Sequence, residues 1–273
     1  MRAWLAGTGL VAAIAVAPMA RACELAPADR PEEPAAYVAL ARACLAAPPA
    51  PARFDSAAEA EFLERVNGER VARGLDRLEL RRGLVAPARF HSLDQVWNGV
   101  HGHAGAAGRR PAERIAALDR RLVYIASREN VAYASGDHDR DDVAEMLHNG
   151  LMNSPGHRAN TLDPDITHAG IGVARVYDQF VVTLVFVAQA GGFRADIPVR
   201  ASWADLSERR IALDHWQVRR LALQTPGGKT LEGAQAAGHR GKARLLVRGE
   251  RDTGGGRYRY IYLSGPLVEL GGG

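Results

Sequence analysis

Histidine and glutamate side chains stand in three short segments where their types could do chemistry. In "LMNSPGHRANTL", the Ser-Pro pair predicts an N-cap followed by the first position of a helix, so His157 lies in the first turn. "HGHAGAAGRRP" is a glycine-rich loop that contains His103, and "RENVAY" places Glu129 just before an apolar run. Imidazole and carboxylate groups are ligands for divalent metals such as zinc, which activates water when one position stays open.

Each of these side chains also has a structural interpretation, and the sequence leaves both open. His157 is either part of a functional cleft or a packing residue. A bulky polar residue in an exposed glycine-rich loop has little to pack against, which favours a functional place for His103. Glu129 either faces a ligand or holds the backbone, whereas Asn130 and Asn160 are expected to satisfy backbone groups of loops.

Two further histidines flank the same loop. His91 precedes it in a helical segment and is expected on an inner face, hydrogen-bonded and without chemistry. His101 lies two residues before His103. In an extended segment successive side chains alternate, and we expect His101 to be solvated.

The first 22 residues predict a signal peptide. Met1-Arg2 is a minimal positive region, an apolar run follows to Ala17, and Ala20-Arg21-Ala22 is an A-x-A cleavage site. The apolar run is too short to span a bilayer comfortably, and no later stretch approaches the ~20 apolar residues of a membrane helix. We therefore expect an exported mature chain, periplasmic or secreted, without a transmembrane segment.

The two cysteines, Cys23 and Cys44, lie in an N-terminal segment, 23–54, that ends in the proline-rich linker "AAPPAPARF". In an oxidising compartment such a pair is expected to form a disulfide, here one that staples a short helix. The alternative is a lipid anchor on Cys23, which directly follows the cleavage site, although Arg21 matches that kind of signal poorly.

The charge of the chain is uneven. The formal net charge is +4, and residues 195–273 carry 13 lysine or arginine residues against 8 aspartate or glutamate. These basic residues are scattered, and the chain is expected to be exported, so nucleic acid is a poor partner.

Hydrophobic periodicity predicts helices around a small antiparallel sheet. Apolar residues recur at helical spacing in 56–74, 83–100, 111–118 and 137–152. "HAGIGVARVYDQFVVTLVFVA" contains two β-branched runs around a turn at Tyr177 and predicts a hairpin. "YIASRENVAYASG" is expected to be a loop with a short extended segment. The fold class is therefore α+β, with layers of helices on a sheet.

That order of elements carries a resemblance. "RFHSLD", "GHAGAAGRRPAERI", "RENVAY", "LMNSPGHRANTLDPDITHAGIGVA" and "FVVTLVFV" resemble the bacterial, SCP-like branch of the CAP superfamily, which also includes cysteine-rich secretory, antigen 5 and pathogenesis-related proteins. The match covers 59–188, within a predicted CAP domain at 55–192. It implies an α-β-α sandwich with a shallow cleft on one side.

The resemblance also assigns positions in that cleft. It implies that His103 and Glu129 belong to the family's tetrad of two histidines and two glutamates. The second glutamate of the tetrad is replaced here by Ser154, and the second histidine by Val181 or Val182. We therefore interpret His157 as a substitute that reaches the cleft from another direction.

Two functions follow from the predicted cleft, whose residues are His103, Glu129, Asn130, Ser154 and His157. The first is an exported scaffold in the cell envelope that binds a small apolar, glycan or peptide ligand, or an envelope protein. The alternative is a hydrolase of envelope peptide or glycan that depends on a divalent metal. In it, His103, Glu129 and His157 would hold zinc, with both histidines neutral. Without a metal, we expect the glutamate to raise the pKa of both histidines and to have its own lowered.

The tail, 193–273, is expected to be an accessory β-rich domain, either a small sandwich or a half-barrel. Its short β-rich segments are separated by glycine and proline turns. In "RYRYIYL" the alternation puts Tyr258, Tyr260 and Tyr262 on one face. We interpret this segment as an ordinary half-buried strand, with an aromatic ligand platform as the alternative.

Overall fold

A computed structural model describes residues 23–25, 32–106, 108–136 and 140–271. The predicted signal peptide, 1–22, lies outside the described residues, as does 137–139 at the start of one predicted helix. Within the described part of the chain, no helix is both long and apolar enough to cross a membrane.

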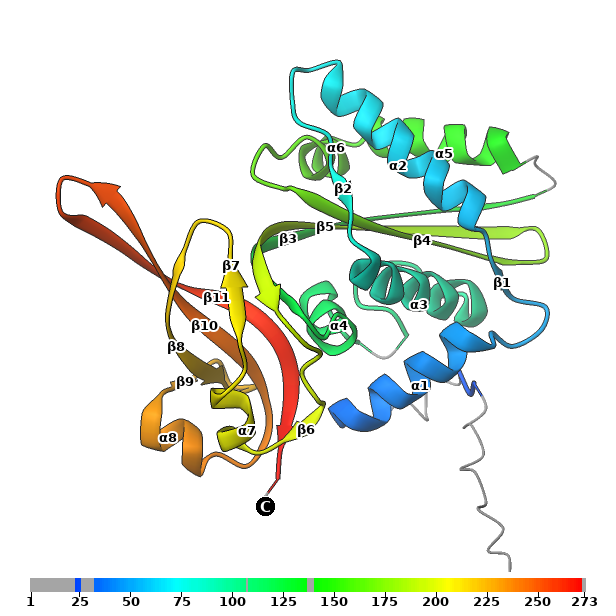
Figure 1. The fold of residues 1–273 in the computed structure, drawn as a ribbon. Helices are drawn as coiled ribbons and strands as arrows, with labels where there is room; N and C mark the ends of the chain where they lie inside the picture. Colours follow the sequence, from blue (N-terminus) through cyan, green and yellow to red (C-terminus); the bar gives the residue numbers. More distant parts are fainter. Residues whose placement is uncertain (1–22, 26–31, 107, 137–139, 272–273) are drawn as a thin grey trace, which may run out of the picture.

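The chain folds into helices on both sides of one long, mainly antiparallel sheet (Figure 1). The helices are α1 (Pro34–Ala46), α2 (Ser56–Val71), α3 (Arg82–Asn98), α4 (Pro111–Leu118), α5 (Arg140–Asn153), α6 (Pro155–Thr161), α7 (Trp203–Ser207) and α8 (Gly233–Gly238). The strands are β1 (Arg53–Phe54), β2 (Glu79–Leu80), β3 (Leu122–Ser135), β4 (His168–Val176), β5 (Gln179–Phe193), β6 (Arg200–Ala201), β7 (Ile211–Leu213), β8 (Gln217–Gln224), β9 (Thr230–Leu231), β10 (Gly241–Gly254) and β11 (Arg257–Leu270). Their main order is β1-β4-β5-β3-β11-β10-β8-β9, with β2 on β4, β6 on β11 and β7 on β5.

Strands β3, β4 and β5 form the middle layer of the predicted α-β-α sandwich. Helices α2, α5 and α6 lie on one side of them, and α1, α3 and α4 lie on the other (Figure 1). Alternate residues of β5 serve the two sides: Phe186 packs in the α2–α5 core, whereas Val181 packs with α1 and α3. The hairpin of β4 and β5 turns at Tyr177, as the sequence predicts.

Two glycines in the "HAGIGV" segment let helix α3 lie directly on strand β4. A Cβ on Gly170 would come within 2.3 Å of the Leu84 Cβ, and one on Gly172 would come within 2.1 Å of the Arg89 backbone nitrogen. Such distances are far below van der Waals contact, so any side chain there would force the helix away from the sheet. Ser92 of α3 completes the contact by donating to the Gly172 carbonyl at 2.8 Å.

The expectation of a loop with a short extended segment around "RENVAY" is wrong. These residues form the 14-residue strand β3, which pairs with β5 along its length. Its polar residues Glu129 and Asn130 are buried and find partners in neighbouring helices and loops. A polar pair inside a buried strand lacks the hydrophobic pattern on which strand prediction rests.

The N-terminal segment is held as predicted by a disulfide between Cys23 and Cys44. Both cysteines are in the bridge, so neither carries a free thiol in this structure. Helix α1 packs on α3 through Tyr37 and Phe90, whose rings meet edge to face with centroids 5.5 Å apart.

The tail forms the expected β-rich region, and its strands join the main sheet. Strand β11 meets β3 at the pair Ser264 and Tyr124, and β10, β8 and β9 follow outward. The hydrophobic core of the tail includes Val123 and Phe193, from strands β3 and β5. Arg120 also ties the parts together, because its buried guanidinium donates to carbonyls of the tail, including that of Ile197 at 2.9 Å.

The β10–β11 hairpin extends beyond the body of the molecule (Figure 1). Tyr258, Tyr260 and Tyr262 are 52%, 50% and 44% exposed. The alternating arginines Arg257 and Arg259 are exposed as well. The expected half-buried strand is therefore found only at the base of the hairpin, where Leu263 is fully buried.

Candidate functional site

The candidate site lies where the loop after α3 crosses strand β3. Helix α3 ends at Gly99, whose φ of 62° is left-handed, and Gly102 and Gly105 also have positive φ. The loop places the His103 ring against Glu129, with its Nδ1 3.0 Å from Glu129 Oε1. His103 is 56% exposed at its side chain, whereas that of Glu129 is 2% exposed, so the pair opens to solvent at the histidine.

Arg114 of helix α4 completes the surroundings of Glu129. Its Nη2 donates to Glu129 Oε2 at 2.6 Å, and its Nη1 donates to the His103 carbonyl at 2.8 Å. One guanidinium therefore joins the carboxylate on the strand to the backbone of the loop. The side chains of Arg114 and Glu129 are both almost completely buried.

These contacts fix the charges of the pair. Burial raises the pKa of Glu129, but the hydrogen bond from His103 and the charge of Arg114 outweigh it, and its pKa is lowered. The hydrogen bond to Glu129 raises the pKa of His103, against a smaller opposing effect of burial. The carboxylate is thus ionised, and the His103 Nδ1–H donates to it.

His91, a neutral imidazole on α3, contacts the backbone of the loop. Burial, followed by the charge of Arg114, lowers its pKa to about 3. Its Nε2–H donates to the Gly102 carbonyl at 2.9 Å, as expected for an inner-face histidine without chemistry. Because the ring is neutral, its 3.8 Å approach to Glu129 is not an ion pair. The loop can come this close because Gly105 has no side chain: a Cβ there would lie 3.2 Å from the ring.

The same loop makes a second contact two residues earlier. The expected solvated His101 is exposed, but its ring stacks on Tyr133 of β3, with centroids 3.8 Å apart and planes 4° apart. Glu129 and Tyr133 are four residues apart on the strand and so share a face. Tyr133 is 57% exposed, which leaves an aromatic surface on the same face of β3, about 13 Å along the strand from Glu129.

The "SPGHRANT" segment packs on the opposite face of strand β3, the face of Asn130. Ser154 is the N-cap of α6 and Pro155 its first residue, as predicted. Asn130 donates to the His157 carbonyl at 2.9 Å, and Asn160 donates to the Glu129 carbonyl at 3.1 Å. The two asparagines thus satisfy backbone groups, but these belong to helix α6 and strand β3 and not to the expected loops, and the bonds join α6 to the strand that carries the site.

The His157 imidazole does not join His103 and Glu129. In the described residues no hydrogen bond or ion pair links the ring to either, and the backbone carbonyl of His157 is the group in the network. The expectation that Glu129 raises the pKa of both histidines is wrong for His157. Burial and the nearby charge of His103 lower its pKa. The ring is thus near enough to His103 to respond to its charge, while the His157 carbonyl is the group bonded to the strand, through Asn130.

A metal ion fits these residues poorly. Nowhere in the described ranges do three or more histidine, cysteine, aspartate or glutamate side chains gather in a group that could hold one. Both oxygens of Glu129 are engaged, and the cation already beside it is Arg114. A second cation at the same carboxylate would be repelled by the guanidinium.

The residues of this site lie in a region that matches a known protein family. The sequence model of the cysteine-rich secretory protein family, CAP, matches residues 63–189. Residues 63–189 belong to the CAP family. This CAP domain contains His103, Glu129 and His157, and the sheet register places Val181, not Val182, on the Glu129 face.

The relatives of the CAP domain are bacterial. The chain is 31% identical over 117 residues to an uncharacterized protein of Bacillus subtilis, YkwD, and covers 42% of it. It is 29% identical over 125 residues to an uncharacterized membrane protein of the same organism, YlbC, and covers 34% of that one. The matched segments are 43% and 46% of this chain. Because they cover only 42% and 34% of the two relatives, the chain spans less than half the length of either.

Solved structures give weaker similarity. An outer surface protein of Borrelia burgdorferi is 17% identical with a TM-score of 0.43, and the match covers 50% of this chain and 98% of that one. An extracellular SCP-domain protein of Bacillus anthracis is 26% identical with a TM-score of 0.41, covering 49% and 41%.

Arg114 and Tyr133 are the site residues that the sequence argument missed. A signal for Arg114 exists, because it precedes Ile115 in the short helix "PAERIAAL" and is buried with it. An arginine on the buried side of a helix needs an anionic or carbonyl partner. Tyr133 carries no comparable signal, since its partner His101 is brought to it only by the path of the loop.

Proposed function

We propose that the CAP domain is an exported binding scaffold of the cell envelope, and that its ligand-binding surface lies over the loop at His103. The observation that carries this proposal is the neutralisation of Glu129 by Arg114 and His103 inside the fold. A carboxylate held this way stabilises the loop and is not free to act as a base or a metal ligand.

The surface beside that cluster suits a flat ligand. The stacked rings of His101 and Tyr133 are exposed. His103, whose pKa the hydrogen bond to Glu129 raises, lies two residues from His101 on the same loop. Aromatic rings offer a large contact area at a small loss of side-chain entropy, and a hydrogen-bond donor beside them orients the ligand. We therefore propose a glycan or peptide ligand of the envelope.

Co-sedimentation of the mature chain with purified peptidoglycan, which contains both glycan and peptide, tests this proposal. Tyr133→Ala should weaken binding by about tenfold, the effect of losing one aromatic contact. Tyr258→Ala is the matched control, because Tyr258 is 52% exposed on the β10–β11 hairpin, outside the CAP domain. Equal binding by the two variants, or none by the parent chain, would contradict the proposal.

Zinc titration separates this proposal from the metal-dependent hydrolase. We expect no calorimetric binding of Zn²⁺ that depends on His103. One equivalent bound tightly by the parent chain and lost in His103→Ala would replace the scaffold with the hydrolase.

A further inference from the structure

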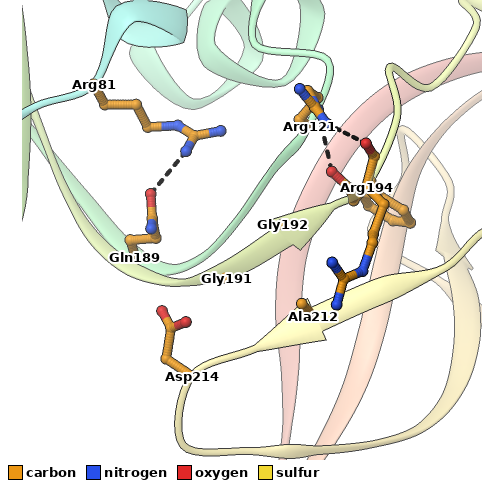
Figure 2. A pocket seen from close by; sticks show the side chains of 9 residues that line it. Arg81, Arg121, Gln189, Gly191, Gly192, Arg194, Ala212 and Asp214 are labelled. Carbon is orange, nitrogen blue, oxygen red and sulfur yellow. Dashed lines mark hydrogen bonds between the residues drawn. The ribbon is translucent and has the colours of Figure 1, made fainter.

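A polar pocket lies where the CAP domain meets the tail, at the other end of α3 from His103 (Figure 2). Its volume is about 390 Å³, within the range of small-molecule sites. The lining residues are Arg81, Arg121, Gln189, Gly191, Gly192, Phe193, Arg194, Ala212 and Asp214. We call it the junction pocket. The 17 residues of α3 separate it from the candidate site by about 25 Å along the helix.

The floor of the junction pocket is formed by two paired strands in close contact, β5 and β7. Strand β7 of the tail pairs with the end of β5 at Gly191 and Gly192. Gly191 has a φ of 139°, and a Cβ there would lie 2.1 Å from the Ala212 carbonyl oxygen. Only glycine permits this approach. The backbone N–H of Asp214 then donates to the Ala190 carbonyl at 2.9 Å, which fixes Asp214 at the rim.

Two of the arginines are held in place by the protein itself. Arg81 makes a two-point ion pair with the buried Asp119, at 2.6 and 3.1 Å, and donates to Gln189 Oε1 at 2.9 Å. Arg121 donates from Nε to the Phe193 carbonyl at 3.2 Å and from Nη2 to the Arg194 carbonyl. Since these carbonyls carry no net charge, they orient Arg121 without neutralising it; Asp196 lies 3.8 Å away with its side chain 70% exposed.

Two ionic side chains of opposite sign at the pocket form no direct bond with any other side chain that the structure describes, although the charge of Asp214 acts on His168. Among the described residues, neither the Arg194 guanidinium nor the Asp214 carboxylate makes a hydrogen bond or ion pair, and both line the junction pocket. Figure 2 shows Arg121 and Arg194 on one side of it and Gln189 and Asp214 on the other. A simple anion would satisfy the arginines but would meet repulsion from Asp214.

We infer that the junction pocket binds a small zwitterion, a free amino acid or dipeptide, with its carboxylate on Arg121 and Arg194 and its ammonium on Asp214. Guanidinium groups match a carboxylate with two parallel hydrogen bonds, and a carboxylate side chain accepts from an ammonium. The Gln189 amide, held by Arg81, adds a neutral polar group on the same side of the pocket as Asp214. This inference does not rest on the proposed function, because it uses none of the residues around His103.

Calorimetric titration of the mature full chain tests the inference with three probes: the dipeptide Ala-Ala, its N-acetyl form and its C-terminal amide. Ala-Ala should bind, and each blocked form should bind about tenfold more weakly, as expected from one lost charge-assisted hydrogen bond. Asp214→Asn should remove the difference between Ala-Ala and its N-acetyl form. Arg194→Gln should reduce the difference between Ala-Ala and its amide.

Arg257→Gln is the matched control, since Arg257 is exposed on the distant hairpin, and it should bind all three probes like the parent chain. Arg194 and Asp214 are both exposed, so their variants should fold normally, which a thermal melt verifies. Three results would overturn the inference: no binding of Ala-Ala at millimolar concentration, equal binding of the blocked forms, or inorganic phosphate binding more tightly than Ala-Ala.

Discussion

The buried neutral His91 should make the free energy of unfolding of this protein decrease at acidic pH, and replacing His91 should remove that part of the decrease. Burial and Arg114 lower its pKa from 6.5 to about 3 in the folded chain. Between these values the unfolded chain binds a proton at His91 that the folded chain does not. The free energy of unfolding therefore falls as pH decreases through this window and is restored above pH 6.5.

The magnitude follows from the width of that window. Each pH unit within it changes the free energy of unfolding by about 1.4 kcal/mol for one proton. From pH 6.5 down to pH 4.5, His91 alone should reduce the stability by about 3 kcal/mol. That is a large share of the ~5–15 kcal/mol by which domains are usually stable.

His91→Gln isolates this contribution. The glutamine amide does not titrate, and its N–H can replace the imidazole Nε2–H as donor to the Gly102 carbonyl. Urea unfolding at pH 7.0 and 4.5, with the disulfide intact, should give a drop in free energy that is about 3 kcal/mol smaller for the variant than for the parent. The other charges around His91, those of His103, Arg114 and Glu129, are present in both proteins.

Two results would refute this reasoning. One is an equal pH dependence in the parent and the variant, with unchanged urea m-values. The other is an NMR titration in which the His91 ring protonates between pH 5 and 7 in the folded chain.

Three other substitutions test the packing that supports the site. Replacing Cys23 and Cys44 together by serine should lower the free energy of unfolding by about 3 kcal/mol, because the bridge closes a loop across a sequence separation of 21; unchanged urea unfolding under oxidising conditions would show that the bridge contributes nothing. Gly172→Ala should lower the free energy of unfolding by about 3 kcal/mol or more, since its Cβ would clash with the α3 backbone. Gly156→Ala, with open space around it, should be tolerated. Equal melting temperatures of the two variants would contradict the packing argument. Asn130→Ala should lower the free energy of unfolding by about 1–3 kcal/mol, because the His157 carbonyl and Asn160 lose a partner, and it should speed amide exchange in α6. Asn149→Ala, on the exposed side of α5, is the control. Unchanged exchange in α6 would show that the amide network does not hold that helix.

Local patterns in the sequence determined much of the CAP domain. The cap at Ser154, the turn at Tyr177 and the helix over 111–118 were predicted where they occur, because each depends on neighbouring residues alone. The two cysteines also sufficed for their pairing, since no other cysteine competes.

The tertiary structure decided the contacts between segments. Strand β3 forms because Glu129 and Asn130 find partners far along the chain, in Arg114 and in α6, and no local pattern reveals such partners. The same alternation sends these two neighbours to opposite faces, so Glu129 meets Arg114 and His103 while Asn130 meets helix α6. His157 stands in the predicted helix, yet its carbonyl is the group that Asn130 uses. The sequence pattern predicts which helix or strand a residue belongs to. Which groups its side chain reaches depends on the other elements that pack against that helix or strand.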